Sequence, residues 1–422
     1  MTRGKFLGRI VDAALLGLLG GLFGTIYLVV VEGGIHRLWG ERVGTAEWFS
    51  APLSVLVIPV VAGLLVGLIY RYFHLPPRFK GFIVELEEGE VEPKTAPGAI
   101  LVAVVSLIGG ASLGPEAPLG TGAGAMGTWL GRRRGLDAEG VRSTTFAGMS
   151  AVFGGLVSSP LGGPLIAFEL EHEQSRSYYF DHLIPGVVAG AVGFGVMYPF
   201  IGAPILGQYD IAGVEFRSWM LLAGVGVGLT GTLVAWVVGQ IMVRTVGVMR
   251  RLDQRPVIRG LAGGVVVAII GFALPLTLFS GESGLGDVMA DRAAIGLLTL
   301  LALIIFKGLA LGASLGGGFY GGPIFPIFFI GGVLGVFMNQ LIPDLPLSLA
   351  VGGAMAAVGG AIALIPLSMM VLAGLLVGAD FLMAGAILIS AATAFVVRYA
   401  LMSRQPEGDA QRASRAQAEP ST

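Results

Sequence analysis

The chain has 422 residues, of which 55% are hydrophobic and only 13% are charged, and its formal net charge is −1. Typical soluble proteins are about 25% charged, so the composition excludes an ordinary soluble protein, and the charge gives no reason to expect a nucleic-acid partner. There is no cysteine, which excludes disulfide bonds, thiol catalysis and cysteine metal sites. The mean hydropathy is +0.83. We therefore predict an all-α, polytopic membrane protein, embedded in the lipid of a cell membrane, with no cofactor.

Apolar runs that predict membrane helices follow one another along most of the chain. They cover residues 10–31, 51–73, 98–110, 118–131, 145–158, 160–172, 183–202, 218–243, 257–279, 293–313, 323–342, 347–360, 362–376 and 378–401. Several are shorter than a bilayer crossing, as expected of tilted or half-length helices around a buried site. The first run is long enough to span and lacks a small-residue cleavage site, which favours a retained helix over a signal peptide. Residues 74–97 form the most polar interior loop.

Lysine and arginine gather at the N-terminus, in residues 132–142, in residues 244–259 and near the C-terminus. Cytoplasmic loops of membrane proteins carry an excess of these residues. The pattern therefore predicts that both termini are cytoplasmic.

Two stretches repeat and divide the chain into similar halves. The letters Gly-Ala-Ser-Leu-Gly at 110–114 recur at 312–316, and a second, looser match follows at nearly the same offset. We predict a first membrane repeat over 1–205, a connector over 206–216, a second repeat over 217–401 and a disordered cytoplasmic tail over 402–422. If each half crosses the membrane an odd number of times, the halves are inverted and their broken helices meet near the midplane.

Each repeat is interrupted by glycine and proline directly ahead of an apolar helix. The first break reads Gly114, Pro115, Glu116, Ala117 and Pro118, and the second ends in Gly322, Pro323, Ile324, Phe325 and Pro326. This pattern is typical of helix starts. The free N–H groups and positive dipole end of a helix N-terminus can bind an anion without a fixed cation. Because Pro323 has no N–H, Ile324 and Phe325 are the predicted donors of the second break.

Glu116 is the only acidic residue in either break. Non-helical backbone at membrane depth survives only where protein buries it or where it lines a wet cavity, and an ionisable residue there is a candidate functional residue. An ionised carboxylate can occupy the anion site itself and leave it when protonated. Glu116 is therefore predicted to be a gate or a proton-coupling element.

The residues of the two breaks resemble the ClC chloride channel and transporter family. The first break is similar to the family motif G-[KR]-E-G-P, with Glu116 in the place of the gating glutamate, and the second resembles G-x-F-x-P. Phe306-Lys307, and Pro160-Leu161 leading to Glu169, are further similarities. The resemblance covers about 10–400 and implies a homodimer in which each subunit has its own pathway for chloride or a similar anion. Glu169, Glu171 and Lys307 are accessory candidates, and Glu169 and Lys307 could each equally have a purely structural role.

The chain also departs from the family pattern. No serine stands where the motif G-S-G-I-P is expected, near 75–90, and no clear match to the late pore tyrosine follows. The place of an inner proton-handling glutamate is taken by Leu170, while Glu171 lies about 100° further round the helix. We interpret the chain as a divergent bacterial-type member, channel-like or weakly coupled to protons. The alternative is a proton-coupled chloride or fluoride antiporter.

The sequence offers three alternatives to this family: a serine hydrolase, a zinc protease and a transporter of another fold. The letters Gly110-Ala111-Ser112 are similar to the serine motif of intramembrane hydrolases, but such an enzyme needs a membrane-embedded histidine beside the serine, and no apolar segment offers one at depth. His172-Glu173 lacks the second histidine of a zinc protease. A transporter of another fold with broken helices is the third alternative. We expect no enzymatic activity.

Overall fold

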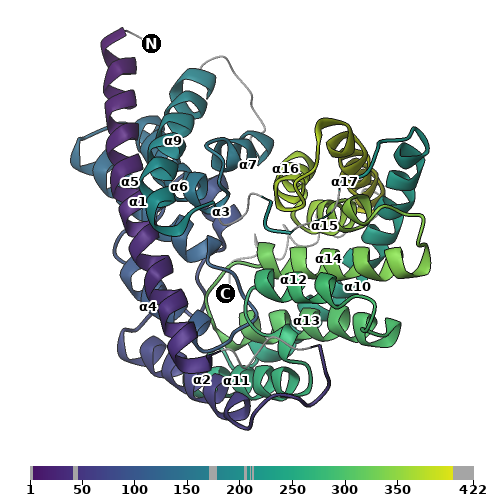
Figure 1. Cartoon of the computed structure of the whole chain (residues 1–422). Coiled ribbons are helices and arrows are strands. Elements are labelled where there is room, and N and C mark those ends of the chain that lie inside the picture. The colour runs from purple at the N-terminus through teal and green to yellow at the C-terminus, as the bar shows by residue number, and fades with distance from the viewer. Residues whose placement is uncertain are drawn as a thin grey trace, which may run out of the picture.

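The computed structural model describes residues 3–40, 46–170, 178–203, 207–209, 211 and 213–402, and in this part of the chain every regular element is a helix (Figure 1). The elements are α1 (Arg3–Trp39), α2 (Ser54–Tyr72), α3 (Phe82–Glu88), α4 (Ala96–Ile108), α5 (Glu116–Arg133), α6 (Ala138–Leu156), α7 (Gly162–Leu170), η1 (Tyr179–Leu183), α9 (Ile184–Ile201), α10 (Trp219–Arg250), α11 (Pro256–Ala273), η2 (Pro275–Thr277), α12 (Glu282–Ala290), α13 (Leu297–Gly317), α14 (Ile324–Leu341), α15 (Leu347–Ala363), α16 (Pro366–Leu376) and α17 (Phe381–Met402).

The prediction of an all-α, polytopic membrane protein is confirmed. Within the described ranges, eight helices are long and apolar enough to cross a membrane. Their outer faces are apolar as well: on α10, Leu222, Leu229 and Leu233 recur at helical spacing and are each more than half exposed. In water such a stripe would be unfavourable, whereas in a bilayer it faces lipid.

The observed helices differ from the predicted runs mainly at their ends. The first helix covers 3–39 rather than 10–31, because polar residues at a helix end can reach water while the backbone stays hydrogen-bonded. Two short helices, α3 and α12, lie in stretches without a predicted segment. The connector lies partly outside the described residues, and the tail from 403 onward does so entirely, so the predicted domain boundaries stay a prediction.

Helices of the two halves approach each other closely where α2 meets α11. A methyl group on Gly63 would lie 2.1 Å from the carbonyl oxygen of Gly260, and one on Gly260 would lie 2.1 Å from that of Gly63. Gly67 and Gly264, one turn further on, make similarly close contacts. Small residues four apart allow membrane helices to pack backbone to backbone. This contact fixes part of the first half against the second, as the neighbouring positions of α2 and α11 in Figure 1 show.

Candidate functional site

The two predicted breaks meet. Gly114 and Gly322 form an isolated antiparallel bridge in which each N–H donates to the carbonyl of the other at 2.8 Å. The repeated serines also pair, because the N–H of Ser112 donates to the hydroxyl of Ser314 at 3.0 Å. A break in a membrane helix leaves backbone groups without partners, and these groups are costly to bury unpaired. Here the backbone groups of one break are hydrogen-bonded to groups of the other.

The bridge places the starts of α5 and α14 together. Helix α5 begins at Glu116 after Pro115, and α14 begins at Ile324 after Pro323. Neither proline acts as a side-chain cap, so the first N–H groups of both helices are available to other partners. Both termini also present the positive end of a helix dipole. The arrangement is suited to binding negative charge.

Glu116 already supplies such a charge. Its side chain is buried, with 1% exposure, and its Oε1 accepts a hydrogen bond from the N–H of Ile324 at 2.7 Å. A carboxylate of the first half therefore caps a helix of the second half. The other oxygen, Oε2, is also buried and has no hydrogen-bond partner among the described residues. Burying a carboxylate costs free energy unless its oxygens are hydrogen-bonded. Within the described chain, only Oε1 is hydrogen-bonded to the protein.

The two bridging glycines leave the space that the carboxyl group fills. A methyl group on Gly322 would lie 2.1 Å from Cδ of Glu116, and one on Gly114 would lie 2.1 Å from its Oε2. Any side chain at either position would therefore overlap the carboxyl group. Glycine is needed here for close approach.

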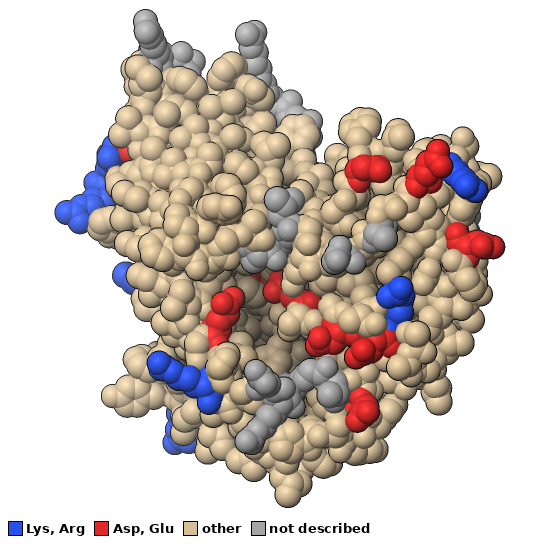
Figure 2. Space-filling model, viewed as in Figure 1, with Lys and Arg blue, Asp and Glu red and all other residues tan. Residues whose placement is uncertain are grey.

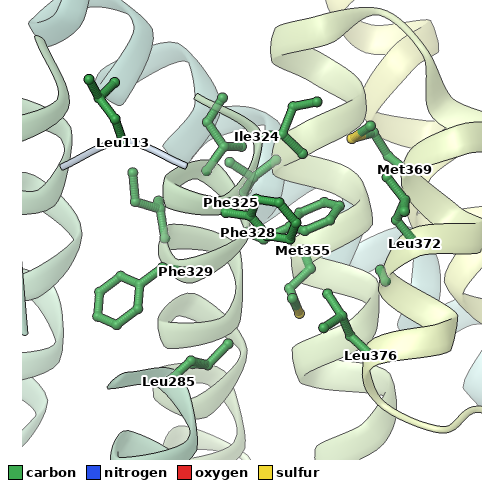
Figure 3. Packing of buried hydrophobic residues seen from close by; sticks show 14 of the residues in the cluster. Leu113, Leu285, Ile324, Phe325, Phe328, Phe329, Met355, Met369, Leu372 and Leu376 are labelled. Carbon is green, nitrogen blue, oxygen red and sulfur yellow. The ribbon is translucent and has the colours of Figure 1, made fainter. Parts of the chain in front are cut away.

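The remaining residues of the breaks form an apolar wall around this point. Ala117, Pro118, Ile324, Phe325 and Pro326 are all buried. Figure 3 shows Leu113 of the first break near the start of α14, with Phe325 and Phe328 packed inside. Such apolar, buried surroundings strengthen electrostatic interactions at the helix starts.

A cavity of about 540 Å³ lies on one side of the site and reaches Pro115 and Leu113. Its walls come from the C-terminal part of α1 and from the start of α12, and they carry three carboxylates: Glu32, Glu282 and Asp287. Figure 2 shows acidic side chains around the hollow of this face. We call this cavity the acidic vestibule. In their ionised form these carboxylates oppose the approach of an anion.

The opposite side of Glu116 is identified by ion pairs. Arg134, after the end of α5, pairs with Asp12 near the start of α1 at 2.6 Å. Arg132 bonds Glu90 at 2.9 Å. The polar segment around α3 therefore lies at the C-terminal end of α5, beside the start of α1. The acidic vestibule lies at the other end of α1 and reaches Pro115, next to Glu116. Glu116 therefore lies between the acidic vestibule and the α3 side of the protein.

Lys307 is fully buried, and its amine donates to the carbonyls of Thr277, Leu278 and Phe279 at 3.2, 2.9 and 2.8 Å. An ammonium group has three donors, and the turn occupies all of them. The geometry matches the structural alternative for Lys307. The amine holds the turn that leads into the acidic vestibule.

Glu169 caps the start of α16. Its carboxylate accepts hydrogen bonds from the N–H of Leu367 at 2.6 Å, and from the N–H and hydroxyl of Ser368 at 2.7 and 2.6 Å. This is the helix-end role that the sequence left open beside an accessory one. Like Glu116, it joins a carboxylate of the first half to a helix start of the second. Glu171 lies outside the described residues.

The segment in place of the absent G-S-G-I-P motif is held by two arginines. Arg259 donates to the carbonyl of Pro77 at 2.6 Å and to Asp253 at 3.1 Å, and Arg78 donates to the same carboxylate at 3.0 Å. Partial burial would raise the pKa of Asp253, but the bonds from Arg78 and Arg259 outweigh it and lower the pKa. The carboxylate therefore stays ionised and fixes the segment to the start of α11.

Sequence reasoning missed one polar group beside the site. Glu85 belongs to the loop that was predicted only as polar, yet it is buried and bonded to Thr121 of α5. The available signal was the short apolar stretch from Phe82 to Leu86, which surrounds this one glutamate in an otherwise charged loop.

The fold and the site define a class: an all-helical membrane protein whose two broken helices meet, start to start, at a buried carboxylate. The family described as "Voltage gated chloride channel" matches residues 62–399, and the chain belongs to this family. This confirms the resemblance inferred from the two breaks.

Known relatives agree with this assignment. A protein of Escherichia fergusonii named "Putative ion-transport protein YfeO" is 26% identical over 321 residues, which is 74% of this chain and 75% of the relative. Among solved structures, a CLC-type fluoride/proton antiporter superposes with a TM-score of 0.77 at 17% identity, covering 94% of this chain and 97% of its own. A slow cyanobacterial Cl⁻/H⁺ antiporter gives 0.74 at 19% identity, covering 93% and 94%. At these identities the structures show the fold alone.

The glycine contacts generate a first prediction. We expect Gly322→Ala to push the Glu116 carboxyl away from the N–H of Ile324 and to destabilise the protein by about 1–3 kcal/mol, as overpacking of a buried site does. A structure of the variant measures the displacement, and thermal unfolding in detergent measures the stability. Gly286→Ala is the matched control, because nothing lies within 4 Å of its added methyl group. A Gly322→Ala structure with the 2.7 Å bond intact would contradict this explanation.

Proposed function

We propose that the protein moves a small inorganic anion, chloride foremost, across the membrane between the starts of α5 and α14, and that Glu116 gates this path. The observation that carries the proposal is the 2.7 Å bond from the N–H of Ile324 to the Glu116 carboxylate. That N–H, at a helix start with no fixed cation bonded to it, is the kind of group that binds a small anion. The gate thus occupies the predicted binding group.

The gating mechanism is competition. Two negative charges a few ångströms apart in a buried site repel strongly, so the permeant anion and the ionised carboxylate exclude each other. Protonation removes the charge of Glu116 and weakens its bond to the amide and to the helix dipole. The anion can then take the amide. Acid therefore favours the open state, and a high anion concentration favours it too.

The relatives support a halide as cargo. The titles of the two solved structures name fluoride and chloride. A site made of backbone amides and an apolar wall suits a small monovalent anion. The acidic vestibule, with Glu32, Glu282 and Asp287, raises the cost of bringing a multiply charged anion to the same place.

We further propose that both termini are cytoplasmic and that the protein is a homodimer in the lipid bilayer, with one pathway in each subunit. The lysine and arginine bias supports this orientation, and the family resemblance supports the dimer. In this orientation the acidic vestibule opens to the outside, and α3 lies on the cytoplasmic side.

A second prediction tests the backbone donor. Ile324 is the first residue of α14, a position where proline fits helical geometry but supplies no N–H. Ile324→Pro should weaken anion binding about tenfold or more, the cost of one hydrogen bond to a charged group, while Ile324→Ala should leave binding largely intact. The same pair of substitutions at Phe325 follows the same logic. Anion affinity is measured calorimetrically in detergent. Equal losses for alanine and proline would exclude the amide as a ligand.

A third prediction concerns Glu116 itself. Wild-type flux should rise as pH falls, because protonation frees the amide. Glu116→Gln removes the charge at nearly constant shape, and Glu116→Ala removes the whole carboxyl group. Both should flatten the pH dependence of chloride flux from liposomes, and the alanine variant should stay open. A wild-type pH response in Glu116→Gln would place the gate elsewhere.

A fourth prediction concerns coupling. Because Leu170 stands where an inner proton-handling carboxylate is expected, we predict chloride flux with little stoichiometric proton counter-flux. Liposomes with a chloride gradient and a pH electrode in the bath measure both ions together. Steady uphill proton movement driven by the chloride gradient would disprove this prediction and make Glu171 and Glu169 the next residues to test.

A further inference from the structure

A surface cavity of about 630 Å³ lies at the C-terminal end of α2 and shares no residue with the acidic vestibule. Its walls come from the last turns of this helix and from the residues that follow it: Leu65, Leu68, Ile69, Arg71, Tyr72, Phe73 and His74. The proposed anion path uses none of these residues. Helix α2 is long and apolar enough to cross a membrane, so the cavity lies where such a helix leaves the bilayer.

This end of α2 belongs to the α3 side of the protein. Residues 75–81 lead directly from α2 to α3. Pro256 and Val257, at the start of α11, pack against Gly67, one turn before Arg71. The cavity therefore faces the leaflet on the α3 side, which is cytoplasmic in the proposed orientation.

The apolar part of the cavity is a stripe along α2. Leu65, Leu68 and Tyr72 recur at helical spacing and are 44%, 44% and 78% exposed. Phe73 follows with 53% exposure, and its ring stands edge-on to that of Tyr72 at 5.1 Å. Side chains at this spacing lie on one face of a helix. Leucines followed by aromatic rings match the change from hydrocarbon to headgroups in a bilayer, so the stripe suits a lipid acyl chain.

Arg71 and His74 give the cavity a polar end. Arg71 is exposed, and in the described part of the chain no hydrogen bond or ion pair engages its guanidinium group. Arg78 and Arg259, on the same side, are both bonded to Asp253. An arginine beside apolar surface and without a carboxylate partner is suited to a phosphate group, which it can bind through two parallel hydrogen bonds.

The charges around this end favour an anionic headgroup. Arg251 and Arg255 are exposed in the turn that precedes α11, whose first residues pack against α2. Asp253 of the same turn is paired with Arg78 at 3.0 Å. None of the residues that line the cavity is acidic. A basic surface at a membrane attracts lipids that carry a net negative charge.

We propose that this cavity binds an anionic phospholipid of the leaflet on the α3 side. The guanidinium group of Arg71 binds the phosphate, His74 lies beside the headgroup, and one acyl chain lies along Leu65, Leu68 and Tyr72. The arginine supplies charge and the stripe supplies apolar contact area, so free phosphate should not replace the lipid. The site does not depend on the proposed anion path.

The bound lipid lies beside the segment that stands in place of the G-S-G-I-P motif. Residues 75–80 follow His74 directly. In this segment the Phe79 ring lies 5.0 Å from the ring of Tyr320, which belongs to the second break. A ligand that binds the folded protein and not the unfolded chain raises the stability of the folded state. The lipid should therefore raise the unfolding temperature of the protein.

The test measures lipid binding to the full-length protein purified in detergent. Native mass spectrometry with phosphatidylglycerol or phosphatidylcholine gives the affinity of each lipid. Phosphatidylglycerol with a photoreactive group in its acyl chain then shows where the lipid lies, because the labelled residues are identified by peptide sequencing. We expect phosphatidylglycerol to bind about tenfold more tightly than phosphatidylcholine, as expected of a contact between opposite charges, and to label residues 65–73.

Arg71→Gln should lower the affinity for phosphatidylglycerol about tenfold or more and leave that for phosphatidylcholine unchanged. It should also abolish the rise in unfolding temperature that phosphatidylglycerol causes. Arg71→Lys, which keeps the charge but not the two parallel bonds, should lose less affinity. Arg133→Gln is the matched control. Arg133 is also exposed on the α3 side, but it stacks on Trp129 at 5.1 Å and does not line the cavity.

Four results would overturn the proposal. Equal affinities for the two lipids would show that the site does not select negative charge. Equal losses for Arg71→Gln and Arg133→Gln would show diffuse attraction to a basic surface. Displacement of the lipid by inorganic phosphate would show a phosphate site in which the acyl chain has no role. Dissociation of a dimer in Arg71→Gln, measured by light scattering, would assign the cavity to a second copy of the chain. None of these results bears on the gate at Glu116.

Discussion

The reciprocal pairing of Gly114 with Gly322 is the contact on which the rest of the site depends. Two helices are interrupted inside the apolar part of the protein, and the backbone groups freed by each interruption are costly to leave unpaired. The two 2.8 Å bonds satisfy them and set the starts of α5 and α14 side by side. Because both residues are glycines, the Glu116 carboxyl fits between them and reaches Ile324. The helix starts and the carboxylate are thus positioned by one contact.

The same geometry sets two electrical effects against each other. The dipole ends and amides of α5 and α14 favour a negative charge at the site, whereas the carboxylates of the acidic vestibule disfavour one at its mouth. Strong binding of an anion at the helix starts therefore does not imply that anions reach the site quickly. Glu116 and Glu169 each place a carboxylate of the first half on a helix start of the second, Glu116 on α14 and Glu169 on α16.

Much of this site could be predicted from the sequence, because glycine, proline and a lone glutamate are local signals. The repeated letters indicated that the breaks correspond, and the missing N–H of Pro323 directed attention to Ile324, which does bond Glu116. The contacts of Glu85 could not be predicted, since it is one of several glutamates in a polar loop and its partners are far away in the sequence. The three carbonyls around Lys307 are likewise set by a tertiary turn. Contacts between residues that are far apart in the sequence leave no recognisable pattern in the residues around them.

The bridge between the halves also constrains how the protein is made. While the ribosome has produced only the first half, Gly114 has no Gly322 to pair with, and Glu116 at the head of α5 lacks the amide that later caps it. A first half released alone into the bilayer would hold unpaired backbone groups at membrane depth. The nascent chain must therefore keep this break wet or shielded by the insertion machinery until α14 arrives. The site is completed late in biogenesis, and a truncated chain cannot preserve half of it.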